Sequence, residues 1–258
     1  MHRPADCIPQ TAGRMWRWTP LQNATIRVCM KRLYLITLAA LAAPAPAAER
    51  GYSVSDFDNV RVTGPFAVTV VPGRATTVKA RGNSLAMEGV SVDVQDGVLI
   101  IQPVAASVSS AARADLAPVA IFVVTPRLSS GRLLGSGTLS ITDMRGPQVD
   151  ISLTGSGTVS VTKLAADKLN IRQSGAGQIV LSGKALSADA NAKGSGGIDS
   201  SALIVADLKL NAASSGNIRM AATRSATGVS SGSGSVLITG KPACAVQNLG
   251  SGQVKCGN

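Results

Sequence analysis

The stretch LLGSGTLSIT, Leu133 to Thr142, places a Gly-Ser-Gly triplet directly before a strand-like run of alternating residues. Related triplets return six more times, at spacings of 18 to 20 residues. A nearly constant period of this length is typical of a solenoid, in which each repeat packs on its neighbours. The last glycine of each triplet, which we call the anchor, marks the series: Gly137, Gly157, Gly177, Gly196, Gly216, Gly234 and Gly252.

The residues around each anchor alternate with a period of two. The residue two positions after the anchor is always aliphatic, and the residue four positions after it is apolar in every repeat but one, where Ser200 stands. A second alternating run precedes each triplet, as in VDISL from Val149 to Leu153. Since alternate side chains of a strand share a face, each repeat can bury that face only against the next repeat. The sequence therefore predicts an all-β fold, a single-stranded parallel β-helix or solenoid with a right-handed coil.

The segment ahead of the regular repeats is also β-rich but follows a looser rhythm. We interpret 52–130 as the cap and the first irregular coils, and 131–258 as the regular coils, of one domain spanning 49–258. The run GPFAVTV, from Gly64 to Val70, has the inward pattern of a coil. The small-residue stretch from Ala105 to Ala117 is interpreted as a surface loop or a short helix.

The N-terminal part has the pattern of a secretory signal peptide over 30–48. Met30-Lys31-Arg32 gives a basic start, and an apolar run of 11 residues follows before a small-residue exit near Ala48. This run is much shorter than the roughly 20 residues that span a bilayer. We interpret 1–29 as an upstream extension outside the fold. The mature chain is therefore expected to be exported, without a transmembrane anchor, to a periplasmic, outer-membrane-associated or extracellular location.

Removal of residues 1–48 would lower the formal net charge from +11 to about +6, because six basic residues and one acidic residue leave with them. The remaining Lys and Arg residues are scattered singly, with no aromatic residues between them, so we expect a solvated surface rather than nucleic-acid binding. The mature sequence has no histidine, which excludes triads and zinc sites built on imidazole. We predict no catalytic residue, no metal site and no cofactor.

Two cysteines, Cys244 and Cys256, remain in the mature sequence. An even number of cysteines in an oxidising compartment favours a disulfide. Cys256 lies four residues after Gly252 and Cys244 lies eight before it, so both would point into the final coil. A bond between them would seal that end of the stack. The alternative is a pair of buried free thiols.

The order of motifs resembles that of a known family. FDNVRVTGPFAVTVVPG (Phe57 to Gly73) is followed by SVDVQDGVLIIQP (Ser91 to Pro103), by a strand that ends in proline, and by the Gly-Ser-Gly repeats. This succession resembles the auto-transporter adhesin head GIN domain family of exported bacterial proteins, over roughly Val54 to Gly257. The resemblance implies a β-helical fold and a periplasmic, outer-membrane-associated or extracellular setting. It supplies no catalytic residues.

The triplets themselves fit neither a phosphate loop nor a catalytic serine. They lack the following Lys-Ser/Thr of a P-loop and do not open onto a helix. Ser156 departs from the G-x-S-x-G spacing, and no histidine is present to activate it. We predict a structural role, in which glycine allows a tight corner and the small middle residue allows successive corners to stack.

The expected function is a secreted, non-catalytic module for cell-envelope structure or adhesion-like interaction, with a protein or glycan partner and with oligomers possible through a lateral sheet face. One alternative is a polysaccharide-acting β-helix enzyme, a lyase or glycosidase, which needs converging carboxylates. Another is a glycan- or ice-binding β-face built from partial Thr and Ser columns. The acidic residues are dispersed over different columns, and Gln178, Gly197 and Asn217 interrupt the hydroxyl columns, so both alternatives are disfavoured.

Overall fold

The computed structural model describes residues 48–104 and 119–257. The predicted upstream extension, the signal peptide apart from Ala48, and the stretch from Ala105 to Ala117 lie outside these residues. In the described part of the chain, no helix has the length and apolar character needed to cross a membrane.

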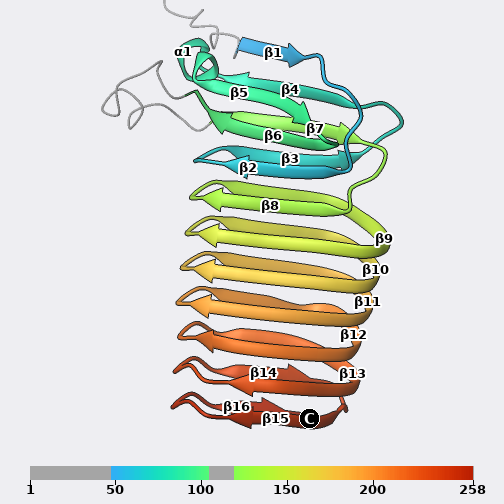
Figure 1. The fold of residues 1–258 in the computed structure, drawn as a ribbon, viewed down its shortest axis with the longest axis vertical. Helices are drawn as coiled ribbons and strands as arrows, with labels where there is room; N and C mark the ends of the chain where they lie inside the picture. The colour runs from blue at the N-terminus through green and yellow to red at the C-terminus, as the bar shows by residue number, and fades with distance from the viewer. Residues whose placement is uncertain (1–47, 105–118, 258) are drawn as a thin grey trace, which may run out of the picture. The chain divides into compact units, whose positions relative to one another are not determined.

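The regular part of the fold consists of long parallel strands (Figure 1). Each of these strands runs along both sides of a flattened coil. After each triplet the chain runs along one side, which we call arm 1, then bends and returns along the opposite side, arm 2. This arrangement confirms the predicted parallel β-solenoid; the right-handed coil stays a prediction. The strands that run along both arms are β9 (Thr138–Gly155), β10 (Thr158–Gly175), β11 (Gln178–Gly194), β12 (Gly197–Ser214) and β13 (Ile218–Ser230). In the last coils β14 (Val236–Thr239) and β16 (Val254–Cys256) lie on arm 1, and β15 (Ala243–Asn248) lies on arm 2.

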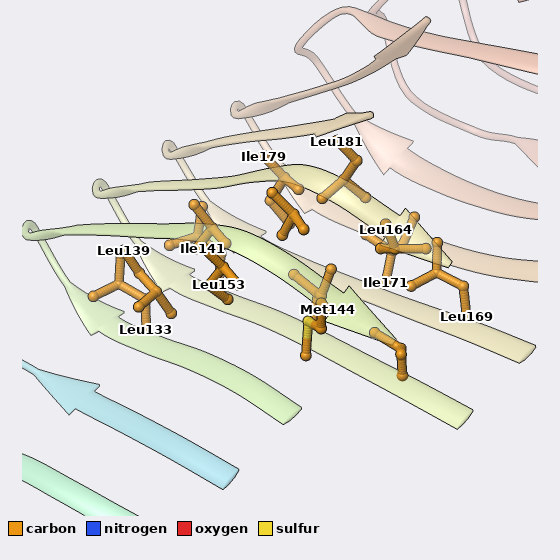
Figure 2. Packing of buried hydrophobic residues seen from close by; sticks show 14 of the residues in the cluster. Leu133, Leu139, Ile141, Met144, Leu153, Leu164, Leu169, Ile171, Ile179 and Leu181 are labelled. Carbon is orange, nitrogen blue, oxygen red and sulfur yellow. The ribbon is translucent and has the colours of Figure 1, made fainter. Parts of the chain in front are cut away.

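The inward columns predicted from the repeats meet between the two arms. Figure 2 shows Leu139 and Ile141 of arm 1 near Leu153, which comes from arm 2 of the same strand. The strand register stacks each of these residues on its equivalent in the next coil, as Leu139 is stacked on Val159. Burial of each such side chain contributes about 1.5 to 3 kcal/mol before the cost of ordering the chain. The core is therefore one narrow apolar layer that continues from coil to coil.

The bend between the arms adds a buried column that the alternation did not predict. Met144, Leu164 and Leu203 are each at most 2% exposed and fill the core at this end of the coil. The spacing between inward residues changes from two to three at the bend, from Ile141 to Met144 and from Val161 to Leu164, so the period of two is lost there. Ser200, the polar exception in an inward column, is fully buried, and its hydroxyl donates a 3.2 Å hydrogen bond to the carbonyl oxygen of Arg219.

The N-terminal segment contains both a cap and true coils. An antiparallel layer and one short helix cover this end of the stack, whereas the other strands pair in parallel like the regular coils. The capping elements are β1 (Ala48–Tyr52), β4 (Thr77–Gly82), α1 (Ser84–Glu88) and β5 (Val90–Gln95). The coil-forming strands are β2 (Asn59–Thr63), β3 (Ala67–Pro72), β6 (Val98–Pro103), β7 (Ala120–Thr125) and β8 (Ser130–Gly135).

The order of these first coils along the stack differs from their order in the chain. Strand β2 lies between β6 and β8, and β3 lies between β7 and β9 (Figure 1). The coil made by β2 and β3 is thus inserted between segments that are contiguous in the sequence. Its GPFAVTV run has the predicted coil register, with Val68 opposite Leu139 and Val70 opposite Ile141.

Each triplet forms a corner of the coil, and its first and last glycines have different roles there. The first glycine has the left-handed backbone that favours glycine: Gly155 has a φ of +117°, and Gly135, Gly175 and Gly194 are similar. The anchor Gly157 does not. Instead, a methyl group on it would overlap the carbonyl oxygen of Gly137 and lie 2.8 Å from Cδ2 of Leu133. The special conformation therefore belongs to the first glycine, and the anchor is needed for close approach.

Backbone hydrogen bonds continue the strand ladders through the corners. The amides of Ser156 and Gly157 both donate to the carbonyl oxygen of Gly135, at 3.1 and 2.9 Å, and the amide of Thr158 donates to Gly137 at 3.0 Å. The side chain of Ser156 is exposed, so packing does not fix its identity. Backbone contacts thus hold this corner on the previous one, and at the corner that ends at Gly216 the Ser214 hydroxyl adds a 3.0 Å hydrogen bond to the carbonyl oxygen of Gly196.

We predict that Gly157→Val destabilises the fold by about 3 kcal/mol, because the new side chain must push two stacked corners apart. Ser156→Ala should change the free energy of unfolding by less than about 0.5 kcal/mol, because its side chain is exposed. Urea unfolding of the two variants and the parent protein measures both values. Equal destabilisation by the two substitutions would contradict this account of the corner.

Candidate interaction faces

The two arms give the solenoid two flat outward faces. We call them the arm 1 face and the arm 2 face. On the arm 2 face, the ladder register aligns outward residues of successive coils, with Arg61 opposite Arg132, Arg132 opposite Ser152, and Ser152 opposite Arg172. We call these four residues the arginine column. It continues into Asn191 and Asn211.

The arginines of this column are only partly neutralised. Nη1 of Arg172 lies 3.7 Å from Oδ1 of Asp150, and the Arg172 side chain is 61% exposed. Arg61 and Arg132 have no ion-pair partner among the residues that the structure describes. Like charges directly opposite each other on neighbouring strands are unfavourable. The arginine column is therefore a positively charged strip, and a negatively charged partner would offset the repulsion between its arginines.

The residues on either side of the arginine column differ in character. On the side away from the corner, Asp150 accepts a 2.9 Å hydrogen bond from Asn170, and Asp189 accepts a 2.7 Å hydrogen bond from Asn191. On the corner side, the outward residues carry hydroxyl, apolar or positively charged side chains. These corner-side residues are Thr63, Leu134, Thr154, Ser174 and Lys193.

The arm 1 face carries the hydroxyl columns predicted from the sequence, and they are short. Thr138 lies opposite Thr158, and the hydroxyl of Ser160 donates to that of Ser140 at 3.2 Å. In the following coils Gln178 and Val180 occupy these two columns. A continuous hydroxyl array of the kind that an ice-binding surface would present is therefore not formed over the described coils.

Several carboxylates that could serve an enzyme are already held in ion pairs. Hydrogen bonds from the Arg224 guanidinium and the Ser225 hydroxyl lower the pKa of Asp207 to about 2. Hydrogen bonds from Ser201 lower the pKa of Asp199. A general acid needs the opposite shift, towards the working pH. These two aspartates are thus suited to stabilising the surface of the stack rather than to donating a proton.

A shallow hollow beside the bend contains Arg127, Leu128, Asp143 and Arg145. Both oxygens of the Asp143 carboxylate accept hydrogen bonds from the Arg145 guanidinium, each 2.7 Å long. In the residues that the structure describes, three or more metal-ligating side chains do not gather anywhere. Two of the charged groups of this hollow, Asp143 and Arg145, thus already pair with each other on the surface.

The predicted structural residues lie in one line along the corner edge and at the last coil. A methyl group on Gly177, Gly196, Gly216, Gly234 or Gly252 would in each case meet the preceding anchor, as on Gly157 it would meet Gly137. Cys244 lies opposite Ala226 and Cys256 opposite Ile238, in the columns that the repeat register predicts, but Cys244 is exposed and Cys256 is half-buried rather than both being enclosed in the coil. The two cysteines are placed as a bonded pair, with Cα atoms 6.4 Å apart across the coil.

Sequence reasoning missed the arginine column, although part of its signal was present. Arg132 and Arg172 each lie five residues before an anchor glycine, as Ser152 does. Alignment on the anchors therefore places these three in one outward column. Arg61 gives no such signal, because β2 enters the stack out of chain order.

The fold and its two flat faces define a two-armed parallel β-solenoid module. A family model described as "Putative auto-transporter adhesin, head GIN domain" matches residues 56–242, and the chain belongs to this family. The resemblance seen in the sequence is thereby confirmed. No curated protein matches the chain.

Solved structures share the fold at low sequence identity. A putative adhesin from Bacteroides fragilis NCTC 9343 is 22% identical with a TM-score of 0.75, over 82% of this chain and 98% of that chain. A protein from Parabacteroides distasonis ATCC 8503, described as a putative lipid binding protein, is 22% identical with a TM-score of 0.63, over 80% and 95%. A putative adhesin from Parabacteroides merdae ATCC 43184 is 18% identical with a TM-score of 0.62, over 80% and 94%. At these identities the similarity concerns the fold.

We propose that Cys244 and Cys256 form a disulfide in the exported protein. A loop of this length contributes about 3 kcal/mol in the chain-entropy account, so Cys244→Ser should lower the free energy of unfolding by about that amount. Thiol titration of the unfolded, unreduced protein should find no free thiol from this pair. Two free thiols would rule out the bond.

Proposed function

We propose that the chain is an exported, non-catalytic module that acts in the cell envelope through adhesion-like binding. The observation that carries this proposal is the arm 2 face, a flat surface on which successive coils align their outward side chains in register. Such a face suits a partner that lies across several coils. Membership of the adhesin head family and the signal peptide pattern support the same role.

The surface carboxylates support a role without catalysis. Asp143, Asp150, Asp199 and Asp207 each pair with an arginine, and the pKa values of the last two are lowered. A polysaccharide-acting enzyme needs a carboxylic acid with a raised pKa near a second carboxylate. Incubation with acidic and neutral polysaccharides, with and without Ca²⁺, should therefore give no products. Turnover of any of them would contradict the proposal.

We predict that the immobilised full chain captures a specific component from the envelope fraction. Ser152→Trp, which places a large side chain in the middle of the arm 2 face, should lower this capture at least tenfold. Ser160→Trp makes the same change on the arm 1 face and is the matched control. Circular dichroism and thermal unfolding check that both variants remain folded.

The capture experiment also identifies the chemical class of the partner. Protease treatment of the envelope fraction removes protein partners, whereas periodate oxidation destroys glycans. The proposal is wrong if nothing is captured, or if folded Ser152→Trp captures as much as the parent chain while Ser160→Trp does not.

A further inference from the structure

The arginine column concentrates positive charge that the sequence distributes over three separate segments. Arg61 comes from β2, Arg132 from β8 and Arg172 from β10. The insertion of β2 between β6 and β8 places Arg61 directly beside Arg132. Adjacent strands are about 4.8 Å apart, so the three arginines are spaced at about 5 and 10 Å along the stack.

The surroundings of the column favour one side for a bound anion. Asp150 lies on the side away from the corner, where it accepts hydrogen bonds from Gln148 and Asn170 as well as the ion pair with Arg172. On the corner side, Thr154 and Ser174 offer exposed hydroxyl groups and Lys193 adds a further positive charge. The space above the column on the corner side is thus lined by cations and by hydrogen-bonding groups.

These features distinguish between classes of polyanion. Single-stranded nucleic acid requires aromatic side chains on which the bases stack, and the arginine column and the corner-side residues include none. Binding on a membrane surface relies on apolar and aromatic side chains that enter the lipid, whereas Leu134 is the one large apolar side chain among these residues. A glycan uses both groups present: arginine forks pair with carboxylate or sulfate groups, and hydroxyl side chains bond to sugar hydroxyls.

We propose that the arginine column and its corner-side neighbours bind an acidic glycan chain, one that carries carboxylate or sulfate groups, running along the stack across successive strands. This inference rests on the proposed adhesion-like function and names its ligand class. The flat face accepts an extended chain, and the arginine spacing matches charges repeated along a polymer better than a single small anion.

Binding of the full chain to polygalacturonate and to dextran sulfate tests the proposal, with neutral dextran as the uncharged control. The parent chain should bind both polyanions and not dextran. The double variant Arg61→Gln/Arg132→Gln should bind at least tenfold more weakly. The matched control Lys163→Gln/Lys241→Gln removes the same charge outside the column and should stay within twofold of the parent chain. Thermal unfolding confirms that both variants are folded.

Substitution by lysine separates bidentate recognition from charge alone. Arg132→Lys keeps the charge but loses the planar fork, so it should weaken polygalacturonate binding several-fold. The proposal is overturned if neither polyanion binds, if both double variants lose binding equally, or if vesicles of phosphatidylglycerol bind in an arginine-dependent way and the polysaccharides do not. If envelope capture persists and depends on Ser152 while neither polyanion binds, the adhesion-like function stands and the glycan inference is wrong.

Discussion

The structure depends on the close approach of stacked corners, where the backbone of one coil lies directly on the next. At Gly157 there is no room for even a methyl group beside the carbonyl oxygen of Gly137, and the same contact is repeated at the other anchors. The amides of each corner donate to the carbonyl groups of the one before. Because the corners fix where every coil begins, they also fix which side chains share a column. The apolar core, the cysteine pair and the outward faces all follow from that register.

The sequence predicts the structural features that recur with the repeat period, but not those at positions where the alternation of residues changes. The columns at Leu139 and Ile141 and the alignment of Cys244 with the preceding coils follow from the anchor spacing alone. The buried column at Met144 does not, because the spacing between inward residues changes from two to three where the chain bends. The sequence predicted a tight glycine corner but not the different roles of the two glycines, because sequence alone does not distinguish the left-handed backbone of Gly155 from the close approach at Gly157.

The candidate site could be predicted only in part, for a topological reason. Arg132 and Arg172 occupy equivalent positions in their repeats, but their neighbour Arg61 comes from a coil inserted out of chain order. No local pattern in the sequence records that insertion. Packing constrains the inward positions in every coil, whereas outward positions tolerate most residues. The outward residues of the two faces therefore determine what such a fold binds. The two faces differ accordingly, with short hydroxyl columns on arm 1 and positive charge on arm 2.

The register of adjacent coils is the central claim, and engineered cross-linking measures it directly. Ser140 and Ser160 lie opposite each other on the arm 1 face, with their hydroxyl oxygens 3.2 Å apart. In the double variant Ser140→Cys/Ser160→Cys, a disulfide should form in air and be detected by mass spectrometry. The pair Ser140→Cys/Thr158→Cys is one outward position out of register, beyond the reach of a disulfide, and should stay reduced. A bond in the second variant and none in the first would contradict the account.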